Sequence, residues 1–383
     1  MHGMHCLCRR GLLLFAWLVP ATSGLAAAVE PDPLLDLTNV FQLRLWDYSL
    51  DLAGAIGYKD NALLSATNRL TSAFWDTRAD ALVFRLPADG WMCNLIATAE
   101  DTHYFGGKLT QDDKSAVVAA QATRYLDHGW SSTLGTFLAY QDQVLDLSSI
   151  APGQAGASRV VAETARGRWT VRREWGWGWG EVEAAGTRQV LEAPLDSFWQ
   201  AGPKLSFGHR FSTNSEVAVT GQWNDLRFDS RENVTRSGDS LTNSLLRMSL
   251  LSCGINWRQA WDRPGHWSTT LAFSFESDRD NGSGYFNLFQ YSVLPGLEYR
   301  RGRWKVGASL RASWFEFPVQ MVGGTNNAAF RSKFAVGAVV RAECQITPKF
   351  KLFSAWTLDR SQSNLAIDNY LADSISTGVE WRF

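Results

Sequence analysis

Few side chains of this 383-residue chain are arranged for acid, base or nucleophilic chemistry. His103 stands beside Glu100 and Asp101, which makes it the local candidate for proton transfer. No nucleophile elbow, phosphate-binding glycine loop, zinc-protease motif or dinucleotide fingerprint occurs in the sequence. The sequence therefore predicts a protein that is not an enzyme.

A second group of polar residues could bind a cation. It gathers beside Gly282 and consists of Glu276, Asp278, Asp280 and Asn281. An EF-hand requires a different spacing of acids and a glutamate where Phe289 stands, so that motif is absent. We predict an ordinary solvated loop here, with a weak surface Ca²⁺ site as the alternative.

Cysteine usage gives no sign of a metal centre or a disulfide framework. The three cysteines beyond the N-terminal region are Cys93, Cys253 and Cys344, far apart and without CxxC or Cys/His spacing. We interpret them as small apolar residues of strands, and we expect neither a metal nor a cofactor. The formal net charge of −1 likewise implies no nucleic-acid partner.

The elements that would position these residues have a period of two. In residues 46–58 one face is apolar, with aromatic residues at both ends: Trp46, Tyr48, Leu50, Leu52, Ile56 and Tyr58. The other face carries polar and small residues such as Asp51 and Ala53. A lipid-facing strand needs rings at both headgroup levels and aliphatic groups between them. Residues 304–314 repeat the pattern, with Trp304 and Trp314 at the ends of the apolar face.

Connections of alternating length separate these segments. Short turns are predicted near residues 87–90, 127–129, 166–167, 212–214, 261–265, 301–302 and 347–348. Longer polar loops are predicted near 59–73, 101–115, 142–158, 180–197, 229–243, 277–288, 318–330 and 361–373. Together they join about sixteen antiparallel strands in a closed all-β transmembrane barrel, with periplasmic turns and external loops. Arg247 falls on an otherwise apolar face, which predicts a bulge or a shifted register there.

The end of the chain carries a specific resemblance. Residues 374–383 alternate strictly, and the final Trp381 and Phe383 share one face. This resembles the closing strand of Gram-negative outer-membrane β-barrels of the porin-like class. The resemblance implies location in the cell outer membrane, contact with the bilayer, and a role for Phe383 as the signal read by the assembly machinery.

The N-terminus agrees with this compartment. Arg9 and Arg10 precede a short apolar run, and Ala26 to Ala28 supply small residues for cleavage. We therefore expect a signal peptide over residues 1–28, a short periplasmic segment over 29–45 and the barrel over 46–383.

Three tryptophans, Trp175, Trp177 and Trp179, alternate with glycines where a predicted strand reaches an external loop. On one strand face they would form part of an outer aromatic girdle, which is the interpretation we favour. A platform for sugar rings inside the lumen is the alternative.

Charged residues at mid-strand cannot face lipid, because an Arg or Lys there costs roughly 2–4 kcal/mol. Alternation therefore predicts that these side chains line the lumen: Asp51, Arg172, Glu298, Lys305, Arg311, Lys333, Arg341 and Glu343. A salt-bridged, plugged interior and a water-filled passage with a mild preference for anions both remain open. The sequence thus favours a channel for passive diffusion of small hydrophilic solutes; the alternative is a structural barrel that anchors a partner protein. The oligomeric state is left open.

Overall fold

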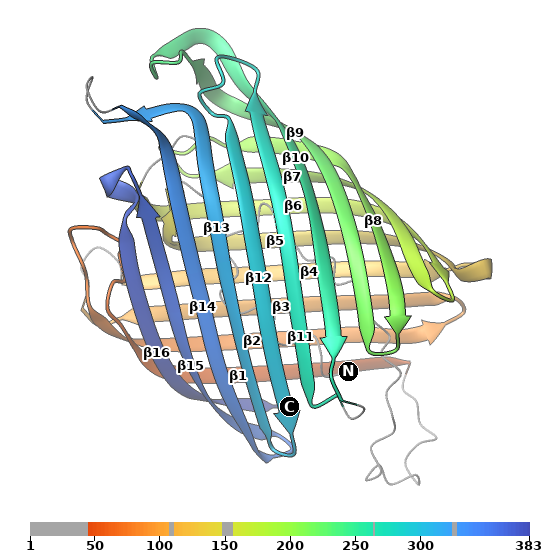
Figure 1. Cartoon of the computed structure of the whole chain (residues 1–383). Helices are drawn as coiled ribbons and strands as arrows, with labels where there is room; N and C mark the ends of the chain where they lie inside the picture. The colour runs from red at the N-terminus through yellow and green to blue at the C-terminus, as the bar shows by residue number, and fades with distance from the viewer. Residues whose placement is uncertain (1–44, 107–110, 148–155, 263–264, 324–327) are drawn as a thin grey trace, which may run out of the picture.

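The computed structural model of the chain describes residues 45–106, 111–147, 156–262, 265–323 and 328–383. These residues form sixteen antiparallel strands, each paired with its neighbours in sequence (Figure 1). Strand β1 also pairs with β16, which closes the ring. This confirms the predicted fold class and strand count. The predicted signal peptide, and the segment 29–45 except Leu45, lie outside the described residues.

The strands are longer than the apolar segments that predicted them. They are β1 (Trp46–Lys59), β2 (Ser72–Ala88), β3 (Trp91–Tyr104), β4 (Asp112–Tyr125), β5 (Trp130–Asp146), β6 (Ala157–Trp175), β7 (Gly178–Leu191), β8 (Phe198–Ser212), β9 (Ser215–Val234), β10 (Ser240–Ala260), β11 (Trp267–Asp280), β12 (Leu288–Arg301), β13 (Trp304–Val322), β14 (Ala329–Thr347), β15 (Phe350–Ser363) and β16 (Tyr370–Arg382). Two short 3₁₀ turns, η3 (Asp127–Gly129) and η5 (Ala366–Asp368), interrupt the connections. Within the described ranges, no helix is long and apolar enough to cross a bilayer.

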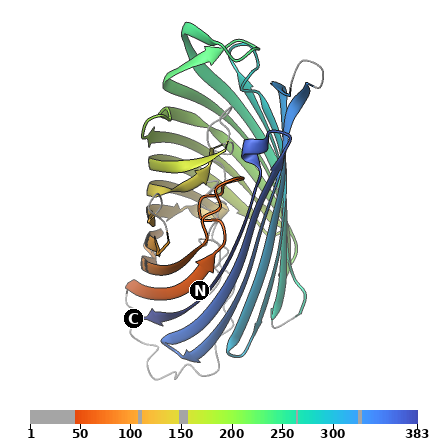
Figure 2. The ribbon, with the colours of Figure 1, turned by 90° about the vertical axis from the view of Figure 1, so that its left-hand side faces the viewer.

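Alternation along each strand separates an outer face from an inner one. On β1, Tyr48 is 70% exposed, whereas Asp51 on the other face is 3% exposed. The register keeps like faces together, since Leu52 stands opposite Ala79 of β2 and Trp381 of β16. The result is an apolar outer band around a polar interior, enclosed by the curved wall seen in Figure 2. A closed barrel of this kind satisfies every strand's backbone within lipid, so the chain is an outer-membrane β-barrel.

Hairpin connections differ at the two ends of the barrel. At one end, called the turn end here, most connections have two residues; at the other, the loop end, they have five to twelve. Asp89 and Gly90 form one of the two-residue turns with φ of 53° and 75°, a left-handed backbone that glycine adopts without a steric penalty. The C-terminus lies at the turn end (Figure 1).

One predicted turn is wrong. Arg166 and Gly167 lie in the middle of β6, where Gly167 stands opposite Gly186 of β7. The chain turns instead at residues 176–177, and β7 occupies a segment that the sequence predicts as a loop. The reason is that Gly167, on the outer face of β6, does not interrupt the pairing of β6 with β7. The segment of β7 also alternates as a strand does, with polar residues on its inner face and small residues on its outer face.

The irregularity predicted near Arg247 is present. The pairing of β9 with β10 shifts register between Leu245 and Arg247, and Arg247 stands directly opposite Arg227 on the outer face. The bulge therefore does not turn Arg247 inward.

The aromatic residues expected at the lipid interfaces all have exposed side chains: Trp46, Tyr48, Tyr58, Trp304, Trp314, Trp381 and Phe383. Trp381 and Phe383 stack with ring centroids 6.0 Å apart, and the Phe383 backbone N–H donates to the Leu50 carbonyl at 2.9 Å. The interface role of these rings and the assembly role of Phe383 stay predictions.

The facing of the strands can be tested by single substitutions. Leu52→Arg and Leu310→Arg should each destabilise the folded barrel by about 2–4 kcal/mol, because a guanidinium would enter hydrocarbon. Ala53→Arg and Ser309→Arg, one residue away on the inner face, should be nearly neutral. Urea denaturation of the barrel refolded in lipid vesicles gives the free energies; equal effects at neighbouring positions would contradict the assigned registers.

Candidate functional site

The inner wall of β13 to β16 is a network of paired charges. Arg341 bonds to Glu343 and lies 3.6 Å from Glu380, and Lys351 contacts Glu380 at 2.5 Å and Glu343 at 3.4 Å. The Arg341 guanidinium also stacks over Phe353, 4.0 Å from the ring centroid. The two cations and two anions thus neutralise one another across three strands.

Three further predicted lumen residues, Glu298, Lys305 and Asp51, are paired on this wall or on the strands beside it. Lys305 Nζ lies 3.1 Å from Glu298, which also accepts from Arg300 at 2.9 Å. At the seam of the barrel, Arg382 donates two bonds to Asp51, at 2.8 and 2.9 Å. This fork-to-fork geometry ties β16 to β1 from the inside.

A second charged wall covers β6 to β8. Arg166 contacts Glu183 at 2.6 Å, and Arg168 lies 3.8 Å from the same carboxylate. Arg172 contacts Glu174 at 2.9 Å and lies 3.6 Å from Glu181. Arg172 stands near the turn end of β6, three residues before its last residue, rather than at mid-strand as the sequence predicted.

Arg311 differs from the other predicted lumen cations. It is half-buried on β13, and its guanidinium lies 3.7 Å from the position that a Cβ on Gly337 would take. A methyl group at that site on β14 would be in ordinary contact with the guanidinium. Within the described residues Arg311 forms no direct salt bridge, but Asp359 of β15, opposite Gly337, lies close enough to interact with it electrostatically.

At the loop end, two distant parts of the barrel meet. Asp146, the last residue of β5, forms a salt bridge with Lys333 of β14, and both side chains are almost fully buried. In a ring of sixteen, β5 and β14 are separated by seven strand steps in one direction and nine in the other, so they belong to opposite walls. The end of the β5–β6 hairpin therefore reaches across the lumen.

A second contact holds the same hairpin end. The backbone N–H of Gly156 donates to Asp368 in η5 at 2.8 Å, and Asp368 also pairs with Arg331 of β14 at 2.7 Å. The side chains of Asp368 and Arg331 are 0% and 2% exposed. We call these two contacts, Asp146–Lys333 and Gly156–Asp368–Arg331, the cross-lumen contacts.

Apolar side chains pack beside the cross-lumen contacts. Leu64, from the loop between β1 and β2, is buried with Tyr370 and Ala372 of β16 and packs against Val144 and Ala157 of the hairpin. Nothing in the local sequence around Leu64 distinguishes it from an ordinary loop residue.

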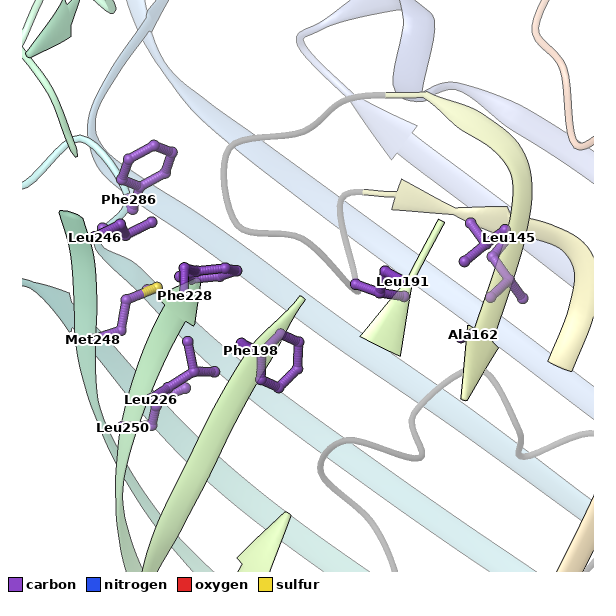
Figure 3. Close-up of a cluster of buried hydrophobic side chains, with 11 residues drawn as sticks. Leu145, Ala162, Leu191, Phe198, Leu226, Phe228, Leu246, Met248, Leu250 and Phe286 are labelled. Carbon is purple, nitrogen blue, oxygen red and sulfur yellow. The ribbon is translucent and has the colours of Figure 1, made fainter. Parts of the chain in front are cut away.

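The inner wall of β5 to β10 carries a larger apolar cluster at the loop end. Figure 3 shows its side chains converging from these strands and from the loop between β11 and β12. Its members are Leu145, Val160, Ala162, Leu191, Phe198, Leu226, Phe228, Leu246, Met248, Leu250 and Phe286. Apolar packing and the cross-lumen contacts together narrow the loop-end mouth, a constriction that the moderate loop lengths did not reveal.

Most of the remaining candidate residues are arranged differently from their predictions. His103 faces outward and bonds to Asp112 at 2.7 Å, whereas Glu100 stands opposite Arg78 on the inner face. Of the two acids considered for proton transfer, Glu100 is therefore separated from His103, whereas Asp101 shares its outer face. Cys93, Cys253 and Cys344 are free and lie within strands, as expected.

The acidic cluster is also placed differently from its prediction. Glu276, Asp278 and Asp280 belong to β11 and share its inner face, and Asp280 accepts the backbone N–H groups of Gly282, Gly284 and Phe286. Within the described ranges, no group of three acidic, histidine or cysteine residues is arranged to hold a metal ion.

The three tryptophans do not share a face. Trp175 and Trp177 stack at the turn end, with centroids 5.6 Å apart, and Trp177 lies in the turn itself. Trp179 is buried inside, under the Arg172 guanidinium at 4.1 Å, and donates to Glu216 at 3.1 Å. The turn at residues 176–177 separates the rings, so the three do not form one surface, and they lie at the turn end and not beside an external loop as predicted. Trp175 and Trp177 contact Phe207 on the outside, and their place in an aromatic girdle stays a prediction.

Comparison with known proteins finds only distant structural similarities. No protein-family model matches the chain, and no curated protein matches it. A loop-deleted form of OmpT, an outer membrane protein of Vibrio cholerae, is 9% identical with a TM-score of 0.45, over 88% of this chain and 99% of that one. OccAB1 of Acinetobacter baumannii is 7% identical with a TM-score of 0.45, over 88% and 97%. The copper transporter OprC is 11% identical with a TM-score of 0.44, over 88% and 69%. With similarities this low, the assignment as an outer-membrane barrel rests on the strand pairing and outer surface described above.

Proposed function

We propose that the protein is a passive channel for small hydrophilic solutes across the outer membrane. The observation that carries the proposal is the polar, charged inner face of a closed ring of sixteen strands. A barrel of this size has a bore wider than its own side chains fill, and charged walls hold water. The role involves no catalytic residue and no cofactor.

The constricted loop-end mouth supports passage of small solutes over large ones. The apolar cluster fills one side of the mouth, and the cross-lumen contacts connect the β5–β6 hairpin to the opposite wall. A solute that enters from the loop end must pass between these groups.

Selectivity in this proposal depends mainly on Arg311. Arg172, Lys305, Lys333 and Arg341 are each paired with a carboxylate, which reduces their attraction for a passing anion. Arg311 has no direct ion pair among the described residues, although Asp359 lies nearby, so we propose a mild preference for anions.

A structural barrel that conducts little is the second candidate. The same cross-lumen contacts and apolar cluster favour it, because buried ion pairs and packed aliphatic groups exclude water. The two candidates differ in the measured conductance.

The first test is single-channel recording of the purified full chain in planar bilayers. The channel proposal expects discrete, ohmic current steps in KCl, because water and ions share the lumen. Correctly folded protein, verified by its faster migration before heating on SDS gels, that never conducts would overturn the channel proposal and leave the structural barrel.

Ion selectivity is tested by the reversal potential under a KCl gradient. The wild type should prefer anions, and Arg311→Glu alone should move the preference toward cations, because it reverses a lumen charge that forms no direct ion pair. The triple variant, with Arg172, Arg311 and Arg341 each changed to Glu, should move the ion preference further toward cations. Added salt should weaken the effect, since the Debye length is about 10 Å at 0.1 M. A reversal potential that Arg311→Glu leaves unchanged would show that this side chain lies away from the ion path.

The cross-lumen contact is tested by removing both charges together. A single substitution would leave one buried ion unpaired and destabilise the fold by about 3–5 kcal/mol. The double change Asp146→Asn with Lys333→Met avoids this cost. Loss of one of the two cross-lumen contacts should loosen the hairpin end and increase conductance. Asp229→Asn with Arg188→Met is the matched control, because that pair is exposed and worth about 0–1 kcal/mol. Unchanged conductance in the folded Asp146/Lys333 variant would show that the contact does not limit flow.

A further inference from the structure

Arginines gather on the outer surface of the barrel near the loop end of β9, β10 and β11. Arg227, Arg247 and Arg279 are all exposed and occupy outward positions of the three strands. Arg227 and Arg247 stand directly opposite each other across the β9–β10 ladder. Like charges in such a pair destabilise a sheet unless an anion lies nearby.

The protein supplies only part of that negative charge. Arg227 contacts Asp225 at 2.7 Å. Among the described residues, no carboxylate pairs with the side chain of Arg247 or Arg279. Two of the three cations are therefore left for an external partner.

Arg227 and Arg247 stand at one level, and Arg279 stands opposite Ser249, two residues nearer the turn end. Each lies four residues beyond a large apolar outer residue of its own strand: Trp223 before Arg227, Leu251 before Arg247 and Phe275 before Arg279, counted toward the loop end. Four residues correspond to roughly 13 Å along a strand, and less along the membrane normal because barrel strands are tilted. The arginines thus lie beyond the apolar band, separated from it by one outward polar residue on each strand (Asp225, Ser249 and Ser277), at the height of lipid headgroups. Their flexible stems can reach down to the band.

Local structure keeps the arginines together. The backbone N–H of Arg247 donates to the Asn281 side chain at 3.0 Å, which fixes Arg247 beside the end of β11, two residues from Arg279. On the other side of Arg227, Arg188 of β7 stacks over Trp199 at 5.1 Å while pairing with Asp229. Because Asp229 neutralises Arg188, the cationic surface is confined to β9, β10 and β11.

We propose that Arg227, Arg247 and Arg279 form a binding site for phosphate groups of lipid headgroups in the outer leaflet. Guanidinium groups bind phosphate oxygens in bidentate fashion, and a site on the bilayer-facing wall is presented to lipid rather than to the lumen. The loop end faces outward in an outer-membrane barrel, which selects the outer leaflet. The proposal is independent of whether the lumen conducts.

Native mass spectrometry of the detergent-solubilised full chain tests the site, with bisphosphorylated lipid A as the probe. The triple variant Arg227→Gln, Arg247→Gln and Arg279→Gln should bind the lipid more weakly by about fivefold per arginine removed. Lipid A without phosphates should bind the wild type no better than it binds the triple variant. Inorganic phosphate, the free-ion arm, should compete only weakly because it lacks the acyl chains.

The matched control removes three outward arginines from the turn end, Arg124, Arg173 and Arg301, each changed to Gln. The control variant should keep the wild-type affinity for lipid A. If the loop-end triple variant does not fold, the single variant Arg279→Gln takes its place in the test. Undiminished binding by the loop-end variants would overturn the proposal, as would an equal loss in the control or equal binding of the dephosphorylated lipid. Complete displacement by inorganic phosphate would assign the site to the free ion instead of lipid.

Discussion

The structure depends on closure of the backbone hydrogen-bond ring. In hydrocarbon, an unpaired strand edge would leave a row of peptide groups without partners, at several kcal/mol each. Pairing of β1 with β16 removes both edges at once, although the two strands lie at opposite ends of the chain. The Asp51–Arg382 ion pair and the bond from Phe383 to Leu50 reinforce this seam from its inner side and at its terminus.

Closure also dictates how charge is distributed. Because every second residue must be apolar on the outside, ionic groups of the spanning region are confined to the inner wall, where they neutralise one another over adjacent strands. The Arg341–Glu343–Lys351–Glu380 network is the clearest case. Charge returns to the outer wall only past the apolar band, as at Arg227, Arg247 and Arg279, where the surroundings become polar again.

At the loop end, ring closure and the confinement of charge to the inner wall are joined by a third feature, which is long-range packing inside the ring. The β5–β6 hairpin is continuous with the wall, yet its end contacts β14 and η5 through buried ion pairs. Buried pairs of this kind contribute little net stability but tolerate few alternative partners. The hairpin end is thereby held in one place, which makes the mouth a defined constriction within a wide barrel.

The sequence by itself determined the strands, their faces and their number, because alternation with a period of two is local and repeats in every hairpin. It also located most turns, through pairs such as Asp89 and Gly90. It misplaced the β6–β7 turn, since Gly167 and Gly178 carry the same local signal and only pairing with the neighbouring strands distinguishes them. Alternation assigned the inner faces of Arg311 and Arg341 but could not say which of them has a counter-ion.

Only the tertiary structure decided the loop-end contacts. Asp146 and Lys333 are 187 residues apart, and no pattern within either strand records the other. The same holds for Leu64, which is an unremarkable loop residue until the ring closes and brings β16 and the β5–β6 hairpin beside it. Local sequence specifies which face a side chain occupies, whereas contacts across the lumen exist only once sixteen strands have fixed the diameter of the barrel.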